Sequence, residues 1–137
     1  MRILSIDYGK KRTGLAVTDP LQIIAGGLGT VETSVLYEYI EAYIQREQVE
    51  RIVIGKPMQP NGQPSENMVR VENFYNRWRK AHPEIPIEYY DERFTSVLAH
   101  RAMIDGGVKK KTRREKKGLV DEISATIILQ DYLQSRK

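Results

Sequence analysis

The sequence contains no cysteine among its 137 residues. This absence excludes a disulfide scaffold, a thiolate metal site, an iron–sulfur cluster and a cysteine nucleophile. The sequence also lacks any stretch that approaches the roughly 18 apolar residues of a membrane-spanning helix. The first apolar run is short and ends at Asp7, which does not fit a signal peptide. We therefore expect a cytoplasmic protein with no membrane partner.

Positive charge exceeds negative charge only slightly, with 22 basic and 18 acidic residues and a net charge of +4. Segment 109–117 (KKKTRREKK) alone has seven basic residues and one acidic residue. A local basic segment is typical of proteins that bind a polyanion, although it could also be a solvated loop that keeps the protein soluble. The candidate nucleic-acid-binding residues in this segment are Lys109, Lys110, Lys111, Arg113, Arg114, Lys116 and Lys117.

The length and the apolar periodicity predict one α/β domain over residues 1–137. After three strands that could pair antiparallel, strands alternate with helices, which predicts parallel pairing with right-handed crossovers. We therefore expect a mixed sheet with helices on both faces. The expected strands cover 2–7, 14–18, 23–31, 51–55 and 85–90, and the expected helices follow an N-cap at Thr33 or Ser34 and cover 66–81, 94–104 and 119–133.

Carboxylates occupy positions where apolar residues are expected. Asp7 ends an apolar strand, Asp121 lies on the packing face of the last helix, and Asp91 and Glu92 follow another strand. A buried, unpaired carboxylate costs several kcal/mol, so such acids are normally paired, bound to metal or at a rim. Asp7 could instead begin a turn, Asp121 could stabilise the helix N-terminus, and Asp91 or Glu92 could cap a helix or pair with Arg93. Adjacent residues on a strand point to opposite faces, so only Asp91 or Glu92 can share a site with Asp7.

Together these acids indicate a metal site, because open α/β sheets place their chemistry at the carboxyl ends of strands. Three neighbouring carboxylates need a cation to remain ionised. Oxygen donors without cysteine or suitably spaced histidine favour Mg²⁺ or Mn²⁺; we expect His82 and His100 at the surface instead. Two such ions about 4 Å apart can activate water and stabilise the leaving oxygen of a phosphodiester. Candidate phosphate contacts beside the acids are Lys10, Lys11, Arg12 and Arg93, each of which could also be a solvated charge.

Four segments in chain order carry a family resemblance: 5–19 (SIDYGKKRTGLAVTD), 53–57 (VIGKP), 90–96 (YDERFTS) and 120–133 (VDEISATIILQDYL). The sequence resembles the YqgF family, also called RuvX, of pre-16S rRNA nucleases and Holliday junction resolvase-like proteins.

This resemblance implies an RNase H-like fold with a central five-stranded mixed sheet. It implies a metal-dependent nuclease with Asp7, Glu92 and Asp121 as catalytic and metal-binding acids. Glu92 is preferred over Asp91 by resemblance, because the family's second acid lies in the DER motif. The implied substrate is precursor rRNA, possible partners include the ribosomal small-subunit precursor, and the alternative is Holliday junction resolution on branched DNA.

Two other function classes remain open at this point. The pattern of Asp7, Gly9, Thr13 and Gly14 is similar to the phosphate loop of actin-like ATPases, but two nucleotide-clamping lobes need a much longer chain. A non-catalytic RNA-binding or ribosome-associated module would need only the basic segment. We expect a monomer or a weak dimer, with Trp78 either in the core or at a dimer surface.

Overall fold

The computed structural model describes residues 1–56, 66–91 and 117–135, without the side chains of 117–120. Within these residues the strands form one sheet in the order β3-β2-β1-β4-β5. Strands β3, β2 and β1 pair antiparallel, whereas β1, β4 and β5 pair parallel, which confirms the predicted mixed sheet. The strands are β1 (Arg2–Asp7), β2 (Arg12–Thr18), β3 (Ala25–Glu32), β4 (Val49–Lys56) and β5 (Ile87–Asp91).

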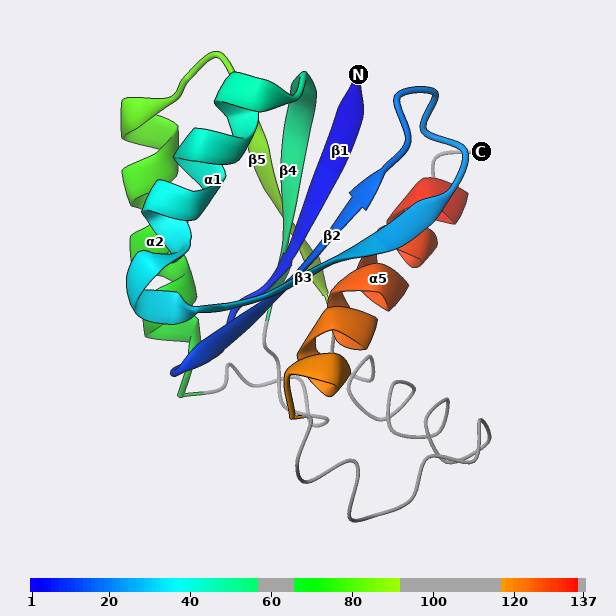
Figure 1. Ribbon diagram of the computed structural model, residues 1–137. Coiled ribbons are helices and arrows are strands. Elements are labelled where there is room, and N and C mark those ends of the chain that lie inside the picture. The colour runs from blue at the N-terminus through cyan, green and yellow to red at the C-terminus, as the bar shows by residue number, and fades with distance from the viewer. Residues whose placement is uncertain (57–65, 92–116, 136–137) are drawn as a thin grey trace.

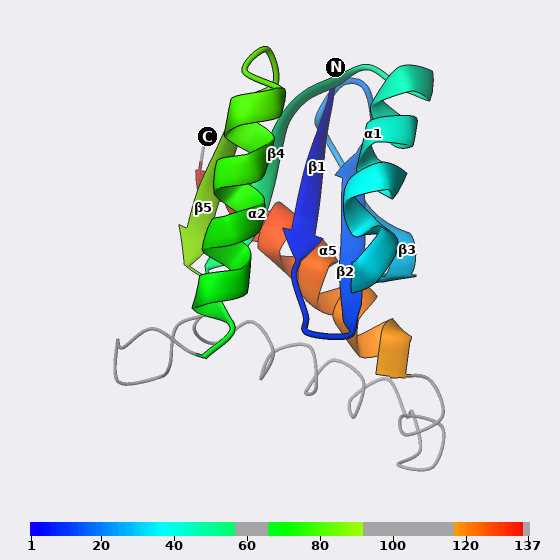
Figure 2. The same cartoon turned by 90° about the vertical axis from the view of Figure 1, so that its left-hand side faces the viewer.

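Helices cover both faces of the sheet, as the sequence predicted. In Figures 1 and 2, α1 (Leu36–Arg46) and α2 (Met68–Ala81) lie on one face and α5 (Lys117–Ser135) crosses the other. The pleat of β1 divides its side chains between these layers. Leu4 and Ile6 pack with residues of α1 and α2, whereas Ile3 packs with residues of α5. Of the described helices, none combines the length and hydropathy needed to cross a membrane.

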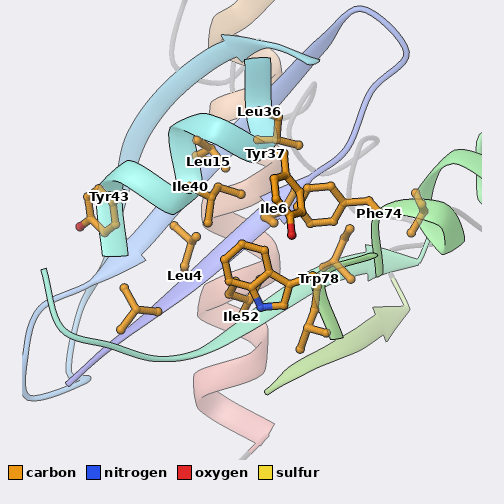
Figure 3. Close-up of a cluster of buried hydrophobic side chains, with 14 residues drawn as sticks. Leu4, Ile6, Leu15, Leu36, Tyr37, Ile40, Tyr43, Ile52, Phe74 and Trp78 are labelled. Carbon is orange, nitrogen blue, oxygen red and sulfur yellow. The ribbon is translucent and has the colours of Figure 1, made fainter. Parts of the chain in front are cut away.

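The larger apolar core lies between the sheet and the helices α1 and α2, as Figure 3 shows. Trp78 is fully buried there and its indole N–H donates to the Ile85 carbonyl at 3.2 Å, so Trp78 is a core residue. The ring of His82 stacks on Trp78 at a centroid distance of 4.2 Å. The His82 side chain is 16% exposed, with Nε2 2.9 Å from Glu41 Oε2, so His82 is more buried than the sequence indicated.

The start of the first helix also differs from the prediction. A short 3₁₀ helix, η1 (Thr33–Val35), precedes α1, and no side chain caps either helix. The Thr33 hydroxyl donates to the Gly9 carbonyl at 2.7 Å and lies 2.8 Å from the Thr13 hydroxyl. The Thr33 hydroxyl, which the sequence assigned to helix capping, is therefore engaged by the turn after β1 and by β2 instead. The predicted helix 94–104 and His100 lie outside the described residues.

Candidate active site

Asp7 ends β1 on the sheet face that α5 covers. Two residues earlier, the Ser5 hydroxyl donates to the Ala125 carbonyl of α5 at 2.9 Å. Side chains two apart on a strand share a face, so the partly buried Asp7 also faces the α5 layer. Asp121 lies four residues, about one helical turn, before Ala125. The first turns of α5 therefore bring Asp121 toward the carboxyl end of β1.

Gly14 connects these two acids. In the antiparallel register of β1 and β2, Asp7 is directly opposite Gly14. A Cβ atom on Gly14 would overlap the main-chain carbonyl of Asp121, so α5 lies directly on the β2 backbone. Asp7 is therefore beside Gly14 in the sheet and Asp121 is above it in the helix layer. The structure brings Asp7 and Asp121, two of the three predicted acids, to the same end of the sheet, at the carboxyl end of β1.

Asp121 is held in a partly desolvated position. Its side chain is 28% exposed, and the Arg12 Nε atom lies 3.4 Å from its Oδ2 atom. Burial raises the pKa of Asp121, and the hydrogen bond and charge of Arg12 partly oppose that rise. Sequence reasoning assigned Arg12 to phosphate, but in the structure it supplies the positive charge next to Asp121.

The strand register distinguishes Asp91 from Glu92. Tyr89 packs with the α1 and α2 core, whereas Tyr90 packs with the α5 core. Strand alternation therefore places the exposed Asp91 on the face away from Asp7. Glu92 itself, like Arg93, lies outside the described residues.

The predicted phosphate contacts are described only in part. Lys10 and Lys11 are exposed in the turn between β1 and β2, at the same sheet edge as Asp7. Thr33 donates its main-chain N–H to the Lys11 carbonyl at 2.9 Å, which fastens this turn to the start of η1. Outside the described residues are Lys109, Lys110, Lys111, Arg113, Arg114 and Lys116, and of Lys117 only the backbone at the start of α5 is described.

The donor set at this edge fits a hard divalent cation. Asp7 and Asp121 offer only carboxylate oxygens, the ligands that Mg²⁺ and Mn²⁺ prefer. The charge of Arg12 already stabilises Asp121 at the place where a cation would do the same. Over 1–56, 66–91 and 121–135, no group of three or more histidine and acidic side chains is close enough to hold a metal. Among the described residues, the candidate ligands at this place are therefore Asp7 and Asp121 alone.

Comparison with known proteins decides the family. A family model described as "RuvX: Holliday junction resolvase" matches residues 1–135. The chain belongs to the RuvX family. Two RuvX relatives, from Phocaeicola vulgatus and Bacteroides thetaiotaomicron, are 64% and 59% identical over 136 residues. Both alignments cover 99% of this chain, with 97% and 98% of the relatives, and both relatives carry the name "Putative pre-16S rRNA nuclease".

Solved structures show that this RuvX chain has the RNase H-like fold of resolvases. A fowlpox virus resolvase in complex with Holliday junction DNA aligns with a TM-score of 0.60 and 12% identity, over 99% of both chains. Thermus thermophilus RuvC with a Holliday junction substrate aligns with a TM-score of 0.58 and 16% identity, over 99% of this chain and 96% of that one. At these identities the likeness shows the fold alone.

Sequence reasoning missed Gly14 as the contact point of α5. A glycine within the apolar strand GLAVT was the available signal, because glycine in a strand often marks a close backbone approach. The ion pair of Arg12 and Asp121 joins residues 109 positions apart, and no local pattern indicates it.

Proposed function

We propose that this RuvX protein is a nuclease dependent on Mg²⁺ or Mn²⁺ that hydrolyses phosphodiester bonds of structured RNA, with the ends of precursor 16S rRNA as its substrate. The observation that carries the proposal is the placement of Asp7 and Asp121 around Gly14 in an RNase H-like fold. The names of the 64% and 59% identical relatives support the RNA substrate. A family match over 1–135 supports one nuclease domain. An rRNA substrate would place its action in the cytoplasm.

In this proposal Asp7 and Asp121 hold the metal together with Glu92, which follows β5. When bound, the metal would activate a water and stabilise the charge that develops on the phosphodiester oxygens. The main-chain contact of Asp121 with Gly14 fixes the helix against the sheet, so the two carboxylates are positioned before substrate arrives. The Arg12 guanidinium favours the ionised form of Asp121 and so partly opposes the effect of burial on its pKa. The exposed Lys10 and Lys11 are placed to contact the phosphate backbone near the reacting group.

A cleavage assay with matched variants tests the acids. The substrate is a precursor 16S rRNA fragment with Mn²⁺, and the variants are Asp7→Asn, Glu92→Gln and, as the control, Asp91→Asn. We expect the first two to lose at least about 100-fold in rate while RNA affinity stays within about twofold, since phosphate contacts and metal ligands are separate contributions. Asp91→Asn should keep its activity because Asp91 lies on the other face. Undiminished cleavage by a highly purified Asp7→Asn preparation would show that the catalytic assignment is wrong.

The family description favours a second candidate, Holliday junction resolution. A four-way DNA junction in the same assay separates the two substrates. Junction cleavage that depends on Asp7, with no cleavage of the precursor rRNA fragment, would replace RNA by branched DNA in the proposal. Binding of RNA without any Asp7-dependent cleavage would instead indicate a non-catalytic RNA-binding module.

A further inference from the structure

A cleft of about 250 Å³ lies on the opposite face of the sheet, directly behind Asp7. Tyr8, the residue after Asp7, forms one wall, and α1 and α2 form the others. The lining residues that matter here are Tyr8, Tyr37, Phe74, Glu38, Arg70 and Arg77. This volume lies below the roughly 300 Å³ at which enclosed small-molecule sites begin, so the cleft could hold only part of a ligand, such as the base and phosphate of one nucleotide.

Tyr8 is the partly exposed ring of the cleft, and Tyr37 and Phe74, each only 7% exposed, support it from the core. The ring centroids of Tyr8 and Phe74 are 5.7 Å apart, and those of Tyr37 and Phe74 are 5.8 Å apart. Figure 3 shows Tyr37 and Phe74 side by side among the buried side chains. Proteins that bind single-stranded nucleic acid stack bases on such rings, whichever base is present. The Tyr8 ring is therefore the place in this cleft where one unpaired base could stack.

Two arginines supply positive charge to the same cleft. Arg70 and Arg77 are seven residues apart on α2 and so share a helix face. The Arg77 guanidinium lies 3.6 Å from the centre of the Tyr37 ring, which leaves its N–H edge for two parallel hydrogen bonds to phosphate oxygens. Within the described part of the chain, neither guanidinium is in an ion pair. Glu38 adds an acceptor that suits the amino or imino groups of a base.

Hydrogen bonds fasten this cleft to the strand end that carries Asp7. The side-chain amide of Asn67, at the N-terminus of α2, donates to the Tyr8 carbonyl at 2.6 Å. On the other side of the turn, Thr33 donates to the Gly9 carbonyl at 2.7 Å. The position of the cleft relative to Asp7 is therefore fixed by both of its walls, and a nucleic-acid strand that passes over the end of β1 meets both places.

We propose that the cleft binds one unpaired nucleotide of the RNA strand that lies across Asp7, with its base against the Tyr8 ring and its phosphate on Arg70 and Arg77. The inference rests on the proposed function, because it takes the bound strand to be the substrate. It adds that single-stranded RNA next to the cleavage site is recognised separately from the duplex part. Arg70 and Arg77 are then binding residues for the strand and not members of the catalytic set.

Fluorescence anisotropy with a labelled single-stranded RNA tests the cleft, in EDTA so that no cleavage occurs. The test variant is Arg70→Ala/Arg77→Ala. The matched control, Arg79→Ala/Lys80→Ala, removes two positive charges from the same helix outside this cleft. We expect the test variant to bind at least about 10-fold more weakly and the control to change less than about twofold. Equal weakening by both variants, or no weakening by either, would overturn the proposal.

Two further measurements test the planar group of Arg77 and the preference for an unpaired nucleotide. Arg77→Lys keeps the charge but not the planar group, so it should still bind single-stranded RNA several-fold more weakly than the wild type, and wild-type affinity would contradict the proposed geometry. Blunt RNA duplex of the same length should show no difference between the test and control variants. A larger loss of duplex binding in the test variant would contradict recognition of an unpaired nucleotide. Because these experiments contain no metal, failure of the cleft leaves the cleavage results of Asp7→Asn unaffected, and the reverse also holds.

Discussion

A methyl group at Gly14 tests whether the contact between α5 and β2 positions the acids. In Gly14→Ala the new Cβ would overlap the carbonyl of Asp121, and the Glu122 main-chain nitrogen would lie 2.8 Å away. Both contacts are with helix backbone, which cannot rotate aside as a side chain could. We therefore expect the first turns of α5 to move away from the sheet and carry Asp121 away from Asp7.

The expected magnitude follows from the cost of overpacking a well-packed site, about 1–3 kcal/mol. At about 4 °C per kcal/mol for a domain of this size, Gly14→Ala should lower the Tm by roughly 4–12 °C. Gly26→Ala is the matched control, because the nearest atom to a Cβ there is the Val17 carbonyl oxygen at 4.0 Å. Its Tm should stay within about 2 °C of the wild type, since the loss of unfolded-state entropy is small and stabilising.

The assay is thermal unfolding followed by circular dichroism, with cleavage of precursor rRNA measured well below the Tm of each variant. Gly14→Ala should lose activity at temperatures where it is fully folded, and Gly26→Ala should not. A Gly14→Ala variant with the Tm and cleavage rate of Gly26→Ala would refute the reasoning, because α5 could not then lie on β2 as described.

Three other predictions concern charge. Burial raises the folded-state pKa of Asp121 above its unfolded value of 3.8, so the stability linked to its protonation is fully present below pH 3.8 and is lost as the pH rises through the folded pKa. Without metal, Asp121→Asn should therefore unfold at a higher urea concentration than the wild type at pH 7, and this difference should shrink toward pH 4. A difference that does not change with pH would show that burial does not raise the pKa of Asp121. Arg12→Ala removes a partly exposed ion pair, so it should lower the free energy of unfolding in urea by less than about 1 kcal/mol. Because it also removes a positive charge beside Asp121, it should tighten Mn²⁺ binding measured by calorimetry. Weaker Mn²⁺ binding would mean that Arg12 helps to position Asp121 for the metal. Neutralising four charges in segment 109–117 should flatten the dependence of log K on log salt for RNA binding by about 0.7–0.9 per lost phosphate contact, and an unchanged slope would exclude that segment from the binding surface.

The sequence predicted those parts of the fold and site that depend on local periodicity. Asp7 could be placed at a strand end and Asp121 on a helix packing face, because both positions follow from repeats of two and 3.6 residues. The alternation of strands and helices along the chain was likewise enough to predict a mixed sheet with two helical layers.

Features that depend on distant partners could not be predicted in this way. The Thr33 hydroxyl bonds to Gly9 and not to a helix N-terminus, because folding brings the turn after β1 against it. The face of the sheet on which Asp91 lies could be inferred only from the packing partners of Tyr89 and Tyr90, which no local pattern contains. The cleft behind Asp7 joins segments that are far apart in the chain, so its arginines were indistinguishable from other surface charges.

Anomalous diffraction from crystals soaked in Mn²⁺ tests the central claim most directly, because it locates the metal without reference to activity. We expect a Mn²⁺ peak with carboxylate oxygens of Asp7 and Asp121 about 2.1 Å away, and Glu92 as a further ligand. Mn²⁺ peaks that contact neither Asp7 nor Asp121, at a concentration that supports cleavage, would contradict the assignment of this sheet edge as the active site.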